Sequence, residues 1–272
     1  MSILSSSNPV LSEQSLGRIF AAEGGATRTN VASVQGVMAK TSFCTILAVG
    51  AGAVGYALVK DYPAVLWISA IASMVISLIL FFVMMANPKA AMIGTPIYSI
   101  TQGVFLGALS FGLEQMLLAQ GITVAGGLAL QAFIITGSLM ASMLALHTFG
   151  IIRAGPRFQS VLAMVTMGVC VAMLLSFVVS MFGVSVPFVN LGDAFGGGSA
   201  AWIGMGLNAA ILILASLWLL VDLARIDEAV AAGAPKSMEW MLAFGLIVTL
   251  AWVYLESLKL AFRVAAMFNS RD

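Results

Sequence analysis

Four ionisable side chains lie within or at the ends of long apolar stretches, where their chemistry would differ most from that of surface groups. They are Glu114, His147, Asp222 and Glu256. A charged side chain at the centre of a membrane helix costs about 2.5–3.5 kcal/mol on insertion scales, so such a residue usually faces the interior of a helix bundle. Glu114 and His147 end their stretches, which favours solvated interfacial positions. Histidine titrates near neutral pH, so a pH-sensing role stays open for His147.

Asp222 and Glu256 are of most interest because each belongs to one of the last two apolar stretches. Two carboxyl groups held close together cannot both ionise easily, so one of them keeps its proton to a higher pH. When ionised, they offer the oxygen ligands that Ca²⁺ prefers. If the two acids converge, they can form a proton sensor and ion gate with a candidate Ca²⁺ site between them. No other metal or cofactor is expected.

Each acid also has a basic residue three positions later, since Arg225 follows Asp222 and Lys259 follows Glu256. Side chains at this spacing meet on the surface of a helix. Two local ion pairs would neutralise the acids and give them a structural role only. The residues alone leave both interpretations open.

The elements that must position these acids follow from composition. Of 272 residues, 61% are hydrophobic and 8% are charged, whereas soluble domains carry about 25% charged residues. Seven continuous apolar stretches are long enough to cross about 30 Å of hydrocarbon as helices, and they lack the alternation of membrane strands. We therefore expect an all-α integral membrane protein with seven transmembrane helices, at residues 37–59, 64–86, 97–118, 123–146, 159–183, 200–223 and 239–262.

Charge indicates how the chain is organised and oriented. The polar residues 1–35 lack the apolar segment of a secretory signal, so we expect a mobile cytoplasmic tail there and a transmembrane domain over 36–272. The balance of 12 Lys and Arg against 11 Asp and Glu argues against binding to nucleic acid. Basic residues gather on cytoplasmic segments, and a cytoplasmic amino terminus places only Lys60 in an outer loop, against eight inside: Arg18, Arg28, Lys40, Lys89, Arg153, Arg157, Arg225 and Lys236.

Two further patterns leave alternatives open. Gly103 and Gly107 form a GxxxG motif, which allows helix backbones to approach closely, either within one chain or in a homodimer. The oligomeric state is not fixed by the sequence. Lys259, Arg263 and Arg271 would lie at the outer end of a seventh full crossing. The last helix is therefore either shielded inside the bundle or crosses incompletely, and the side of the carboxyl terminus stays open.

Short motifs run in order from Ser7-Asn8-Pro9-Val10 to the block 222–263, which is the most specific part and contains Ala232-Gly233-Ala234-Pro235 and Tyr254-Leu255-Glu256. By these motifs the chain resembles the bacterial branch of the Bax inhibitor family, the transmembrane Bax inhibitor motif proteins. The resemblance implies seven helices with the last one surrounded by the other six, in the bacterial cytoplasmic membrane. It also implies a pH-governed cation leak, chiefly for Ca²⁺, and matches Asp222 and Glu256 to the family's acids in helices six and seven.

The spacing of the acids makes their meeting conditional. With a turn near residues 232–237 and a rise of about 1.5 Å per residue, straight helices with level ends would miss by roughly 13 Å. Convergence requires a kink, or part of 234–245 outside the membrane. Otherwise we expect Asp222 to pair with Arg225, Arg153 or His147.

Two function classes remain, and a third is excluded. The first is the pH-sensitive cation leak channel. The second is a regulator without an ion path, which binds a membrane protease or another membrane partner. The setting Val253-Tyr254-Leu255-Glu256 does not build an aspartyl protease site, and HExxH and GxSxG motifs are absent, so no enzyme is expected.

Overall fold

The computed structural model describes residues 31–151, 154–183 and 190–269, in which the regular elements are helices. Seven helical segments, with η2 and α4 forming one of them, are long and apolar enough to cross a membrane. The predicted all-α bundle is therefore confirmed. The elements are α2 (Val34–Asp61), α3 (Ala64–Ala86), η2 (Pro88–Ala90), α4 (Ala91–Leu118), α5 (Leu128–Thr148), α6 (Pro156–Met181), α7 (Asp193–Gly196), α8 (Gly198–Ala231) and α9 (Met238–Asn269).

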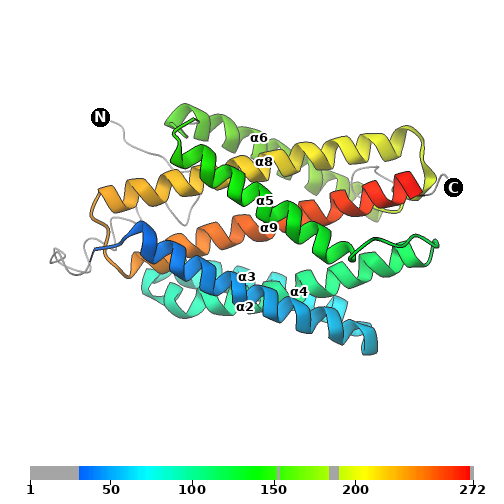
Figure 1. Cartoon of the computed structure of the whole chain (residues 1–272), viewed down its shortest axis with the longest axis horizontal. Coiled ribbons are helices and arrows are strands. Elements are labelled where there is room, and N and C mark those ends of the chain that lie inside the picture. The colour runs from blue at the N-terminus through cyan, green and yellow to red at the C-terminus, as the bar shows by residue number, and fades with distance from the viewer. Residues whose placement is uncertain (1–30, 152–153, 184–189, 270–272) are drawn as a thin grey trace.

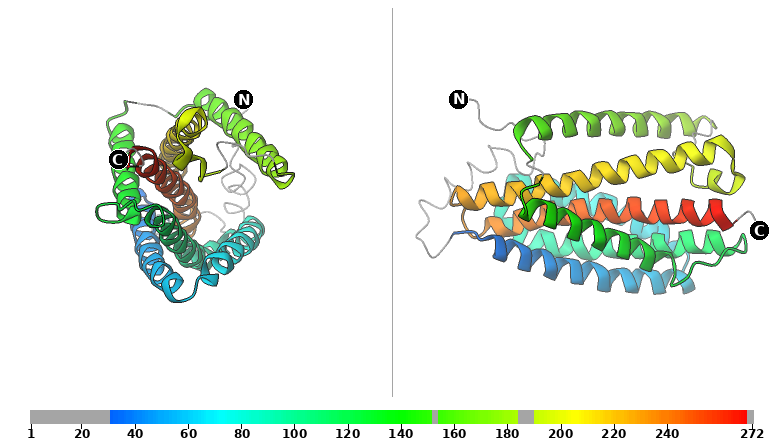
Figure 2. Two further views of the ribbon diagram at one scale, coloured as in Figure 1. Left: turned by 90° about the vertical axis from the view of Figure 1, so that its right-hand side faces the viewer. Right: turned by 45° about the horizontal axis from the view of Figure 1, so that its top comes forward.

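The last helix lies at the centre of the bundle (Figure 1). It packs against α2, α4, α5 and α8, whereas α3 packs chiefly on α4, and α6 lies at the outside against α8 (Figure 2). Within an apolar stretch of 18 residues in each helix, 67% of the residues of α9 are buried, whereas 12% of those of α6 are buried. Of the two alternatives for the last helix, the structure has the shielded one, an unbroken helix of 32 residues. The four closest spans supply most of the shielding.

Most helix boundaries differ by a few residues from the predicted stretches, and the largest extension at a helix end is that of α8, which runs to Ala231 and not to 223. Pro96 lies inside α4, which begins at Ala91 and not at 97. Pro96 has no N–H for the carbonyl of Met92 four residues earlier, and membrane helices tolerate such a proline because neighbouring groups satisfy the freed carbonyl. The fourth span begins at Leu128 and not at 123. Gly126 and Gly127 have φ values of 75° and 82°, a left-handed backbone that ends the preceding loop.

The GxxxG motif brings α4 against α2 within the chain. A Cβ atom at Gly103 would lie 2.2 Å from the carbonyl oxygen of Ala48, and one at Gly107 would lie 1.9 Å from that of Gly52. Gly55 is equally close to α4, because its Cβ would lie 2.3 Å from the oxygen of Val104. This motif therefore serves close packing inside the bundle.

Candidate functional site

Asp222 lies at the interface of α8 and α9 and is 3% exposed. Thr249 on α9 donates its hydroxyl to Oδ2 of Asp222 over 2.5 Å. The other carboxyl oxygen, Oδ1, is buried and has no hydrogen-bond partner among the described residues. A buried carboxyl with one oxygen unsatisfied is costly to the fold, which makes it a candidate for function.

Arg225 lies beside Asp222 but is held by other groups. Its Nη2 donates to Oε1 of Gln159 on α6 over 3.3 Å, and its guanidinium lies 5.8 Å from the ring centre of Trp218. Its charge acts on Asp222 electrostatically, yet no hydrogen bond or ion pair joins the two within the described part of the chain. The local ion pair expected at this spacing is therefore not formed. The guanidinium instead ties α6 to α8.

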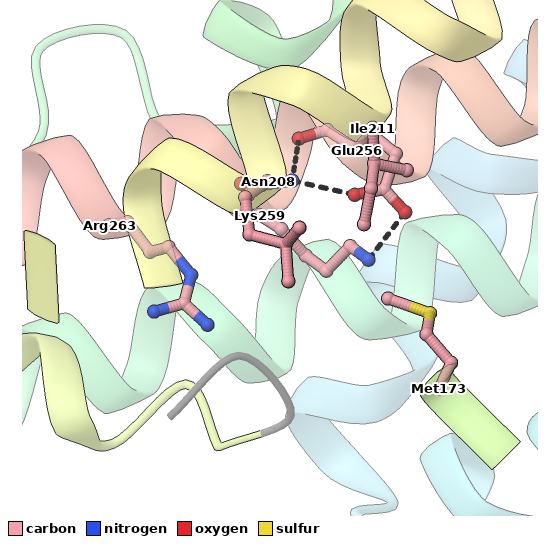
Figure 3. Close-up of a pocket in the computed structure, with 7 residues that line it drawn as sticks. Met173, Asn208, Ile211, Glu256, Lys259 and Arg263 are labelled. Atoms are coloured by element: carbon pink, nitrogen blue, oxygen red, sulfur yellow. Dashed lines mark hydrogen bonds and ion pairs between the residues drawn. The ribbon is translucent and has the colours of Figure 1, made fainter. Parts of the chain in front are cut away.

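Glu256 is 2% exposed and uses both of its carboxyl oxygens. Asn208 on α8 donates its side-chain amide to Oε2 over 2.6 Å, and Lys259 donates its ammonium to Oε1 over 2.5 Å. Figure 3 shows these three side chains meeting between α8 and α9. The partner expected from the three-residue spacing is present here, together with an amide that no motif indicated.

A small cavity of about 10 Å³ adjoins Glu256. Such a volume holds about one water molecule. The Oδ1 atom of Asn208 is buried there without a hydrogen-bond partner among the described residues. The cavity is lined by Met173, Leu207, Asn208, Ile211, Glu256, Lys259 and Arg263.

The two acids do not share one compartment. Asp222 lies nine residues before the end of α8, and Glu256 lies eighteen residues after the start of α9. This difference of nine residues corresponds to about 13 Å along the helix axes. Their hydrogen bonds agree, because Thr249 and Glu256 are seven residues, or about 10 Å, apart on α9. The two acids therefore do not meet in this conformation, since α8 and α9 pack as continuous helices joined by a short turn.

The candidate Ca²⁺ site between the acids is consequently not assembled here. No group of three or more His, Cys, Asp or Glu side chains that could hold a metal ion occurs among the described residues. Each acid can contribute a carboxylate to a cation only at its own level.

The remaining candidates lie apart from the two acids. His147 pairs with Asp227 on α8, with 2.8 Å between Nε2 and Oδ2, and Arg153 lies outside the described residues. Among the described residues, Asp222 accepts from Thr249 and not from His147. Glu114 is half-buried and not simply solvated. It accepts from the hydroxyl of Tyr56 over 2.9 Å and from the backbone N–H that opens α5 over 3.4 Å.

Glu239, which no sequence pattern singled out, organises the end of the bundle that carries the α8–α9 turn. It is 1% exposed and accepts from the ammonium of Lys40 and from the backbone N–H and hydroxyl of Ser33. Its carboxyl lies so close to Gly36 that a Cβ there would be 2.2 Å from Oε1. The only signal in the sequence for these contacts of Glu239 was an acid at the margin of an apolar stretch.

Comparison with known proteins gives one result for nearly the whole chain. No curated protein and no solved structure matches. The family model described as Bax inhibitor 1 like matches residues 8–266, a range that includes Asp222 and Glu256 and all of the membrane-spanning helices except the last residues of α9. The chain belongs to the Bax inhibitor 1 like family.

Proposed function

We propose that this protein is a pH-sensitive cation leak channel, chiefly for Ca²⁺, that uses two separate carboxyl stations. The Asp222 station comprises Asp222, Thr249 and Arg225. The Glu256 station comprises Glu256, Asn208 and Lys259, and the small cavity adjoins it. This proposal keeps the two acids of the original prediction and replaces their direct pairing by two stations along one path.

The observation that carries the proposal is the burial of two acids along one interface, between the two most buried helices of the bundle. Ionisable residues inside membrane segments are costly and characteristically line ion or proton pathways. A purely structural role would be served as well by apolar side chains, because replacing a buried ion pair by a hydrophobic group is often neutral or stabilising.

In the arrangement described, both stations are engaged by protein donors. Thr249 holds one oxygen of Asp222, and Asn208 and Lys259 hold both oxygens of Glu256. A cation gains a carboxylate ligand only when these donors give way, so this arrangement corresponds to a closed state. Protonation cancels the negative charge that would attract Ca²⁺. The leak should therefore decrease as the pH falls.

Orientation belongs to the same proposal. We place the α8–α9 turn and the start of α2 on the cytoplasmic side of a bacterial inner membrane, because basic residues favour that side. The Asp222 station then lies nearer the cytoplasm than the Glu256 station.

The test is Ca²⁺ entry into liposomes that contain the purified protein and a luminal Ca²⁺ dye, measured across a pH series. Asp222→Asn and Glu256→Gln remove one charge each, and we expect each to lower the flux above neutral pH about tenfold, equivalent to about 1.4 kcal/mol. Asp227→Asn is the matched control, because Asp227 lies on the same helix with a side chain that is 56% exposed. It should leave flux and pH dependence unchanged.

Thermal unfolding in detergent establishes that each variant is folded before its flux is compared. Equal flux and equal pH response in the wild type, Asp222→Asn and Glu256→Gln would contradict the channel proposal. No protein-dependent flux in any of them would also contradict it, and would favour the regulator that binds a membrane partner.

A further inference from the structure

We propose that the ammonium group of Lys259 is a tethered counter-ion, which occupies the cation position at Glu256 and must be displaced by an entering ion. The inference deepens the proposed function and rests on it for its role in the leak. The occupancy itself is a separate claim about binding, and it can be tested without transport.

The geometry of the ion pair provides the first support. The ammonium of Lys259 lies 2.5 Å from Oε1 of Glu256, and the lysine side chain is 22% exposed against 3% for the glutamate. The lysine thus reaches a buried carboxylate from a more accessible position. An ammonium and an inorganic cation seek the same carboxylate oxygen, so the two compete for it.

The environment of Asn208 provides the second support. Its amide nitrogen fixes Oε2 of Glu256, while its own oxygen is buried without a partner among the described residues and the residue is 5% exposed. An amide oxygen is a ligand for hard cations. The amide oxygen of Asn208 would be a second oxygen ligand for a cation beside the carboxylate of Glu256. The ion pair between Glu256 and Lys259 makes no use of this oxygen.

The cavity provides room for the exchange. It borders Asn208, Glu256 and Lys259, and its wall includes Met173 on α6 (Figure 3). Methionine is unbranched and adapts its shape easily, so the wall can yield when the lysine moves. Water can take the place of the ammonium, because a cavity of about 10 Å³ has room for about one water molecule.

Arg263 extends the same argument along α9. It lines the cavity one helical turn beyond Lys259, and it is 1% exposed. A cation that enters from the carboxyl-terminal end of α9 therefore meets two positive side chains near the carboxylate. Such charges raise the electrostatic barrier for cations, and the lysine is the one that contacts Glu256.

The experiment compares Lys259→Met with Lys259→Arg in the full-length protein. Methionine keeps a long unbranched side chain and removes the charge, whereas arginine keeps a tethered cation. We expect Lys259→Met to raise the Ca²⁺ flux into liposomes about tenfold, equivalent to about 1.4 kcal/mol, and Lys259→Arg to stay near the wild type. The double variant Glu256→Gln with Lys259→Met should lose this gain.

A binding measurement separates this inference from the proposed function. A ligand that binds only the folded state raises thermal stability, so millimolar Ca²⁺ should raise the unfolding temperature of Lys259→Met but neither that of the wild type nor that of the double variant. If Lys259→Met is stabilised by Ca²⁺ while no protein-dependent flux occurs, the counter-ion inference is supported and the channel proposal is contradicted. If the wild-type flux depends on Asp222 but Lys259→Met shows neither higher flux nor stabilisation by Ca²⁺, the counter-ion inference is contradicted and the channel proposal is supported.

Discussion

Gly107→Ala should loosen the contact between α2 and α4 more than the same change at Gly103 or Gly55, because the buried Gly107 makes the closest of the three approaches. The added Cβ would lie 1.9 Å from the carbonyl oxygen of Gly52 and 2.6 Å from its carbonyl carbon, whereas ordinary contact begins at 3.4 Å. The two backbones must therefore separate by about 1.5 Å, the difference between these distances. The obstacle is backbone and not a movable side chain, so no rotamer change can relieve it.

The expected cost follows from that displacement. Extra methyl groups forced into well-packed interiors cost about 1–3 kcal/mol and occasionally more. The neighbouring close approaches at Gly103 and Gly55 lie on the same interface and would be loosened together with it, so we expect the upper part of this range.

The assay is thermal unfolding of the purified protein in detergent, with Gly50→Ala as the matched control. Gly50 also lies in α2, but a Cβ there meets nothing within 4 Å. Alanine is favoured over glycine in a helix interior by about 1 kcal/mol, so Gly50→Ala should be neutral or slightly stabilising. Equal unfolding temperatures for the two variants would refute the packing argument.

Two further predictions concern the hydrogen bonds of buried acids, and both are measured as the free energy of unfolding. Thr249→Val removes the donor to Asp222 without a large change of shape. It should lower the free energy of unfolding by about 1.5–3 kcal/mol, the range for a hydrogen bond to a charged group. A loss below about 0.5 kcal/mol would contradict the importance of that bond. Lys40→Met leaves Glu239 with only its contacts to Ser33 and should cost about 1–3 kcal/mol, whereas Lys60→Met, at an exposed position, should cost almost nothing.

The helices were predictable because the bilayer limits the choice of structure. A long apolar stretch must satisfy its own backbone groups, and a helix does so. The fixed rise per residue also made the offset of Asp222 and Glu256 predictable at about 13 Å. The condition for the two acids to meet, a kink or a part of 234–245 outside the membrane, could not be decided from the sequence.

The partners of the acids were not predictable from the chain. Thr249 and Asn208 are uncharged, carry no motif, and lie 27 and 48 residues from the acids that they hold. Glu239 and Lys40 are 199 residues apart. Such contacts depend on how helices rotate and pack, and a sequence pattern specifies the faces of a helix better than its depth and rotation against a neighbour.

A double-mutant cycle on Ca²⁺ flux tests the central claim that Asp222 and Glu256 act as separate stations. The flux is measured for the wild type, Asp222→Asn, Glu256→Gln and the double variant in the same liposomes. Sites more than about 7–10 Å apart usually add within about 0.3–0.5 kcal/mol, so the flux of the double variant should equal the product of the two single effects within about twofold. A double variant that conducts as well as either single variant would contradict the account, because the two carboxyls would then act as one unit.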